Sequence, residues 1–104
     1  SNYWSLLTGS EIRQKSGSQF AWSSDGTSAL SASADTGLSR TAAGIVKITD
    51  GSTGAGAFHL QEMTAPSAPS ANNVYIYAED NGAGKTRLMA VFGSGAAQQI
   101  AIEP

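Results

Sequence analysis

The chain has 104 residues, no cysteine and a formal net charge of −2 at pH 7. Its length corresponds to one domain, and the absence of cysteine excludes disulfides and thiolate metal sites. Only six basic residues are present and they are scattered, so we expect no nucleic-acid partner. No run of 18 apolar residues occurs, so we expect no membrane insertion.

Small residues dominate the chain. Gly, Ala, Ser and Thr supply 52 of the 104 residues, whereas Leu, Ile, Val and Phe together supply 18. Burying one large apolar side chain contributes about 1.5–3 kcal/mol, and ordering about 100 residues costs on the order of 100–200 kcal/mol. The low net charge argues against disorder. We therefore expect the fold to take part of its core from neighbouring subunits.

The first half of the chain predicts short strands separated by turns. Large apolar residues alternate with small or polar ones at Gln19–Ser23, which predicts a half-buried strand, and Asp25-Gly26 predicts a turn. The stretch 27–37 has Leu30 as its only large side chain and is predicted to be irregular or to form very short rungs. Further strands are expected at 11–15, 45–49 and 57–61, and Gly9 is expected to break the chain after the opening segment 3–7.

The second half predicts an antiparallel meander. Pro66 and Pro69 mark residues 64–73 as an extended linker, which separates an N-terminal, stalk-like region of short strands (1–63) from the C-terminal part (74–104). Strands are expected at 74–78, 86–92 and 97–102, joined by Gly-rich turns, with a short helix at 96–100 as an alternative. The expected fold class is all-β, built from short strands and tight turns.

The meander holds the densest apolar set in the chain. We expect these residues to form the core or the contact between subunits: Val74, Ile76, Leu88, Val91, Phe92, Ile100 and Ile102.

Aromatic side chains offer a possible sugar-stacking surface. Alternation places Tyr75 and Tyr77 on one face of a strand, opposite Val74 and Ile76. Trp22 is a further candidate for glycan or receptor contact, as are Tyr3 and Trp4. Packing of the same rings is the competing interpretation and the one we favour.

No catalytic, metal or cofactor site is expected, and so no enzyme. The segment Gly82-Ala83-Gly84-Lys85-Thr86 is read as a hairpin turn, because a phosphate-binding loop needs glycine at position 79, which is Glu79. The single histidine, His59, lacks the partners of a metal site or a triad, unless copies of it meet at an oligomer axis. Asp25, Asp35 and Asp50 lie near glycines, which is typical of turns.

Two stretches resemble virion fibre proteins of bacteriophages. The matching residues are Phe20–Ser24 with Asp35–Gly51, and then Ala65–Pro69, Val74–Leu88, Phe92, Gly95 and Ile100-Ala101. They are similar to tail-fibre and head-fibre proteins, in particular to C-terminal segments, and cover about residues 18–104. The resemblance implies an interwoven homotrimeric β-structure and location in the phage particle.

The expected function is therefore that of a structural, non-enzymatic fibre component that assembles with itself and with other virion proteins. A module at a fibre tip that binds a carbohydrate or another host-surface receptor is the alternative. Because the chain begins with Ser1-Asn2, we also expect it to be a fragment of a longer protein.

Overall fold

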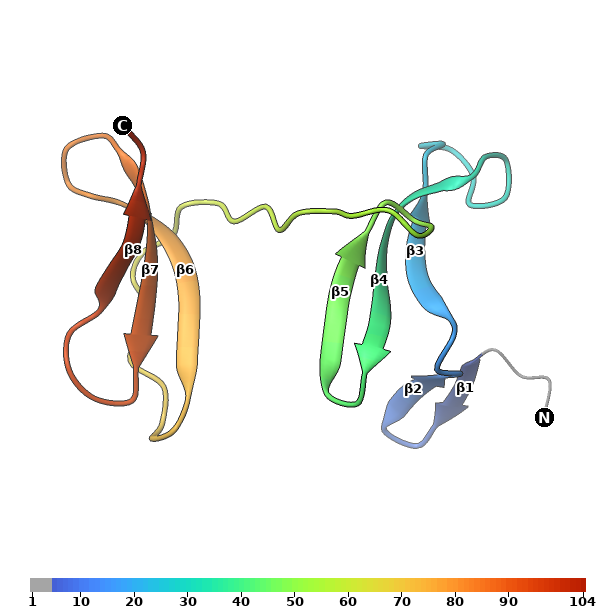
Figure 1. The fold of residues 1–104 in the computed structure, drawn as a ribbon, viewed down its shortest axis with the longest axis horizontal. Coiled ribbons are helices and arrows are strands. Elements are labelled where there is room, and N and C mark those ends of the chain that lie inside the picture. Colours follow the sequence, from blue (N-terminus) through green and yellow to red (C-terminus); the bar gives the residue numbers. More distant parts are fainter. Residues whose placement is uncertain (1–4) are drawn as a thin grey trace. The chain divides into compact units, whose positions relative to one another are not determined.

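The computed structural model describes residues 5–104, in which β-strands are the only regular secondary structure (Figure 1). The expected all-β class is confirmed. The described residues contain no helix that is able to cross a membrane. The chain divides into two compact units, Ser1–Phe58 and His59–Pro104, which are described separately below.

The first unit contains a hairpin and a three-stranded antiparallel sheet. Strands β1 (Ser5–Thr8) and β2 (Glu11–Gln14) form the hairpin. Strands β3 (Gln19–Ser23), β4 (Ala34–Ala42) and β5 (Ile45–Thr49) form the sheet in the order β3-β4-β5. The strands predicted at 19–23 and 45–49 are therefore confirmed.

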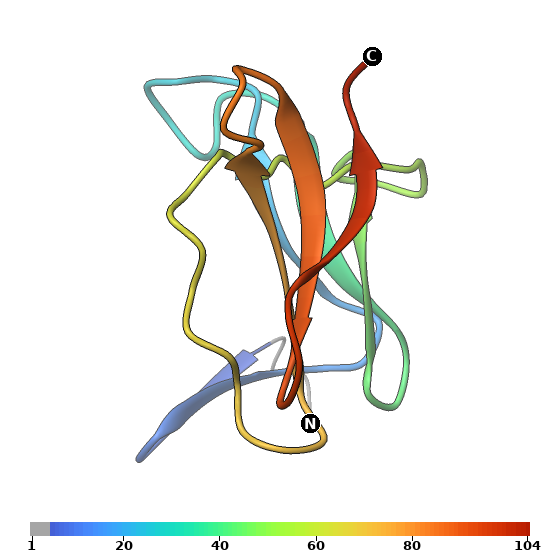
Figure 2. The same ribbon diagram turned by 90° about the vertical axis from the view of Figure 1, so that its left-hand side faces the viewer.

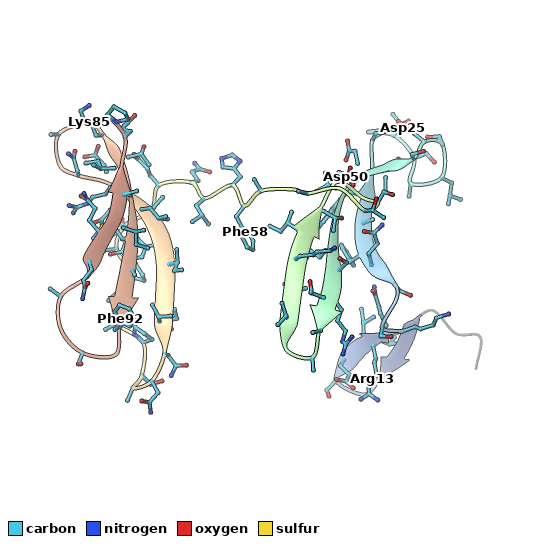
Figure 3. The ribbon with its side chains drawn as sticks, viewed as in Figure 1. Arg13, Asp25, Asp50, Phe58, Lys85 and Phe92 are labelled. Carbon is cyan, nitrogen blue, oxygen red and sulfur yellow. The ribbon has the colours of Figure 1, made fainter. Side chains whose placement is uncertain are left out.

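Three predictions for this half were wrong. Strand β4 occupies part of the stretch expected to be irregular, and Asp35 lies in this strand rather than in a turn. The strand is small and polar, but it is central, so both of its neighbours satisfy its backbone groups. Residues 57–61 form no strand, and Phe58 extends from an unpaired backbone with 77% of its surface exposed (Figure 3).

A polar cluster replaces an apolar core in the first unit. Thr49 is 1% exposed and donates a hydrogen bond from Oγ1 to Oε1 of Gln19 at 3.1 Å. The same Oγ1 accepts the backbone N–H of Gly51 at 3.0 Å, and the Gln19 amide donates to the carbonyl of Gly51. Gly37 lies beneath this cluster, where a side chain would collide with both Gln19 and Thr49.

The second unit is the predicted meander. Strands β6 (Val74–Asp80), β7 (Thr86–Phe92) and β8 (Gln98–Ile102) pair antiparallel in that order. The turn between β6 and β7 forms as expected: Gly82 and Gly84 have φ of 88° and 81°, and the Asn81 side chain accepts the N–H of Ala83 at 2.8 Å. The alternative helix at 96–100 does not occur, because β8 begins at Gln98.

The core of the second unit is small and lies on one face of its sheet. Tyr77, Met89 and Val91 are buried together, with Ala97 packed against them. The segment before β6 runs along the sheet, as Figure 2 shows, and the N–H of Met63 donates to the carbonyl of Ala78 at 2.9 Å. The stretch expected as a linker, 64–73, belongs to this unit, and its Pro69 is buried.

Candidate assembly interface

One face of the first sheet is apolar and lacks a cover in the single chain. The register aligns Phe20 with Leu38 and Leu38 with Ile48, so these three side chains lie in a row across the three strands. Trp22 and Val46 follow at alternate positions on the same face, where they pair with Thr36 and Arg40. We call the five apolar residues the first apolar face. Phe20, Trp22 and Val46 are between 50% and 63% exposed.

The rings on the first apolar face are already ordered. Phe20 and Trp22 pack edge to face, with centroids 5.0 Å apart and an interplanar angle of 72°. A groove of about 320 Å³ lies beside them. Its apolar lining is Phe20, Leu38 and Val46 from the sheet and Ile12 from the hairpin, and its polar lining is Gln14, Lys15, Ser16, Ser18, Ser39 and Arg40. Ile12 is itself 72% exposed. A preformed apolar groove of this kind suits the side chains of another polypeptide.

The second sheet also exposes an apolar face. The pairs Val74–Phe92, Ile76–Ala90 and Ala78–Leu88 lie opposite the buried tyrosine face. We call Val74, Ile76, Leu88 and Phe92 the second apolar face. At its end, a groove of about 480 Å³ is lined by Val74, Phe92 and the neighbouring loops.

The apolar residues predicted to form a core or a subunit contact are divided by the structure. Only Val91 is buried in the single chain, and Leu88 is half-buried. A core role within one chain is therefore wrong for the others, which keep 40–58% of their surface: Val74, Ile76, Phe92, Ile100 and Ile102. For these five residues, a contact between subunits stays a prediction.

The expected aromatic surface does not form as a unit. Tyr77 is 4% exposed and belongs to the core, so its proposed glycan contact is wrong for the single chain. Tyr75 and Trp22 are about half exposed, but they lie in different units. Tyr3 and Trp4 lie outside the described residues.

Ionisable groups in the described part of the chain support turns and strand pairs. No group of three His, Cys, Asp or Glu side chains gathers there as a metal site would require, and His59 is exposed. Asp25 accepts hydrogen bonds from the N–H and Oγ1 of Thr27, both at 2.8 Å, and these bonds lower the pKa of its carboxyl. Arg87 and Glu79 pair across β6 and β7 at 2.8 Å.

Sequence reasoning missed the first apolar face as a unit. Leu38 and Ile48 were not singled out, because the strand that aligns them with Phe20 was not predicted. The alternation at positions 36, 38 and 40 was the available signal, but Leu38 is the only large apolar residue in it.

Comparisons with known proteins returned nothing: no family model, no curated protein and no solved structure matches the chain.

Proposed function

We propose that this chain is a structural, non-enzymatic component of a phage virion fibre and that it works as a homo-oligomer, a trimer by its resemblance to fibre proteins. The observation that carries the assembly is the first apolar face, where Phe20, Trp22 and Val46 keep at least half of their surface exposed to water in a single chain. An exposed apolar patch of this kind marks an interaction surface.

The partner that covers this face is another copy of the chain. The first unit has a buried polar cluster and no buried large apolar side chain among the described residues, so it lacks an adequate core of its own. A fold with this deficit needs its partner whenever it forms, and a second copy is always present. The second unit is similar in part: Val74, Ile76 and Phe92 are 45–58% exposed on the face opposite Tyr77, although Ala78 and Ala90 on that face are buried.

Cysteine labelling tests the proposal, because the chain has no cysteine of its own. Val46→Cys reports on the first apolar face, and Thr41→Cys, at an exposed position of β4, is the matched control. In the assembly we expect a maleimide to react at least about tenfold more slowly with Cys at 46 than at 41. Equal rates would mean that the face stays open and would contradict assembly through it.

The virion assignment has its own test. Mass spectrometry of purified particles of the phage that encodes the chain is expected to detect its peptides. Their absence from complete particles would contradict a virion role and leave the assembly result intact.

A receptor-binding module at a fibre tip is the second candidate. The half-exposed indole of Trp22 favours it, because an open aromatic ring can stack on a sugar. Its packing against Phe20 on the first apolar face favours assembly instead. A glycan array with the wild-type chain and with Trp22→Ala separates the two, since only the receptor module predicts a signal that the substitution removes.

A further inference from the structure

A second groove in the first unit has a different chemistry from the apolar one. It has a volume of about 270 Å³, and its hydroxyl side chains are Ser16, Ser18, Ser39, Ser52 and Thr53. Arg40 and Lys47 also line it, and no carboxylate does. We call it the hydroxyl groove. Two cations at one site are a concentration of positive charge in a chain with a net charge of −2.

Gln19 lines the hydroxyl groove with its side chain already bonded to Thr49 and Gly51, whereas the charged and hydroxyl side chains of the lining have no partner within the described part of the chain. Arg40 and Lys47 form no ion pair there, and none of the five hydroxyl groups takes part in a hydrogen bond. The Oγ of Ser18 is buried as well as unpaired, the one such side-chain atom among the described residues. Buried polar atoms without partners are uncommon and call for an explanation.

The walls of the groove are fixed by the fold. The Asp50 carboxylate accepts the N–H groups of Ser52 and Gly54, each at 3.0 Å, and so holds the loop that carries Ser52 and Thr53 (Figure 3). The opposite wall is a turn closed by a 2.9 Å hydrogen bond from the N–H of Ser18 to the carbonyl of Lys15. A site with rigid walls loses little conformational entropy when a ligand binds.

The hydroxyl groove adjoins the assembly surface, because Ser16, Ser18, Ser39 and Arg40 line both this groove and the groove beside the first apolar face. Ser39 and Lys47 are directly paired in the register, one position along from the Leu38–Ile48 pair, so they lie on the opposite face of the sheet from the first apolar face. Covering the apolar face with another copy therefore leaves Lys47 open to solvent.

From this arrangement we infer that the hydroxyl groove binds an oxyanion that carries hydroxyl groups, such as a uronate or a sugar phosphate. The guanidinium of Arg40 and the ammonium of Lys47 attract the charge and donate to its oxygens. The serine and threonine hydroxyls both donate and accept, so they match the hydroxyl groups of the ligand. The binding requires no metal and no chemical step.

NMR titration of the ¹⁵N-labelled full chain tests this inference. The probes are glucuronate, glucose 6-phosphate, inorganic phosphate and glucose. We expect the two hydroxylated anions to shift the amides of Ser39, Lys47, Ser52 and Thr53, and to bind more tightly than inorganic phosphate, while glucose causes no shift. Raising the salt concentration should weaken the binding of both hydroxylated anions, because salt screens their attraction to Arg40 and Lys47.

Charge removal supplies the control. The double variant Arg40→Gln/Lys47→Gln should bind glucuronate at least about tenfold more weakly. Lys85→Gln should bind it as the wild type does, because the Lys85 ammonium bonds to the Pro104 carbonyl in the other unit. If the double variant does not fold, Lys47→Gln alone carries the comparison.

Three results would overturn the inference: no shift at the groove with either hydroxylated anion, equal binding of glucose, or unchanged affinity in the charge-removed variant. Binding is read from amide shifts and affinities, whereas assembly is read from the mass of the protein, so failure of this inference is distinguishable from failure of the proposed function.

Discussion

Thr49 and Gln19 are joined over the middle of the first sheet, although they belong to strands that are not neighbours. The Oγ1 of Thr49 on β5 donates to Oε1 of Gln19 on β3 at 3.1 Å, and β4 passes between these strands at Gly37. The bond is possible because Gly37 has no side chain. A Cβ there would lie 2.6 Å from the Gln19 oxygen and 2.8 Å from the Thr49 oxygen.

Gly37→Ala should therefore destabilise the first unit by about 1–3 kcal/mol, because the added methyl group forces the two polar side chains apart. Amide hydrogen exchange in β3, β4 and β5 is the measurement, since it reports on this sheet separately from the second unit. Gly26→Ala is the control, because a Cβ at Gly26 meets nothing within 4 Å. Equal protection in the two variants would show that the cluster tolerates the methyl group.

The sheet that carries this cluster was only partly predictable from the sequence. Alternation in Gln19–Ser23 and the apolar run Val74–Tyr77 mark strands by their own composition, so these were predictable. Strand β4 has no such pattern and exists because β3 and β5 pair with it on both sides. Tertiary pairing of this kind overrides local propensity.

The candidate interface was predictable only in part. Alternation correctly placed Tyr75 and Tyr77 opposite Val74 and Ile76. It did not say which face would be buried, because two alternating faces with similar hydrophobicity look alike in a sequence. The structure buries Tyr77 with Met89 and leaves the aliphatic face open.

Val46→Lys should dissociate the assembly, because it adds a second positive charge beside Arg40 on the first apolar face, where another copy would have to desolvate it. Size-exclusion chromatography with light scattering measures the effect as a lower mass at the same protein concentration. Thr41→Lys adds the same charge at an exposed position of β4 and should keep the mass of the wild type. Retention of the full mass by Val46→Lys would place the subunit contact elsewhere.

Tyr77→Ala and Phe92→Ala distinguish the core from the proposed contact in the second unit. Tyr77 is buried, so its truncation should lower the free energy of unfolding by about 3–5 kcal/mol at any protein concentration. Phe92 is 45% exposed in the single chain, so its truncation should have a smaller effect on the isolated fold and a larger one on assembly. Thermal unfolding over a range of protein concentrations separates the two effects. If Phe92→Ala lowers the stability by the same amount at every protein concentration, this would argue against a subunit contact at Phe92.

Acid should release the loop held by Asp25. The hydrogen bonds from Thr27 hold the pKa of this carboxyl below its ordinary value of 3.8. Because the folded value is lower than the unfolded one, the stabilisation is present above pH 3.8 and is lost as the pH falls through the folded value. Carboxyl ¹³C NMR should give a midpoint below 3.8, and Thr27→Val should raise it. A wild-type midpoint at or above 3.8 would contradict the assigned cause.

The most direct test of the account is the mass of the folded protein at micromolar concentration, measured by sedimentation equilibrium. Burial of the first apolar face by other copies predicts an oligomer, with a trimer at three times the chain mass of 10.6 kDa. A stable, folded monomer of 10.6 kDa would show that the chain tolerates its exposed apolar faces and would contradict the central claim.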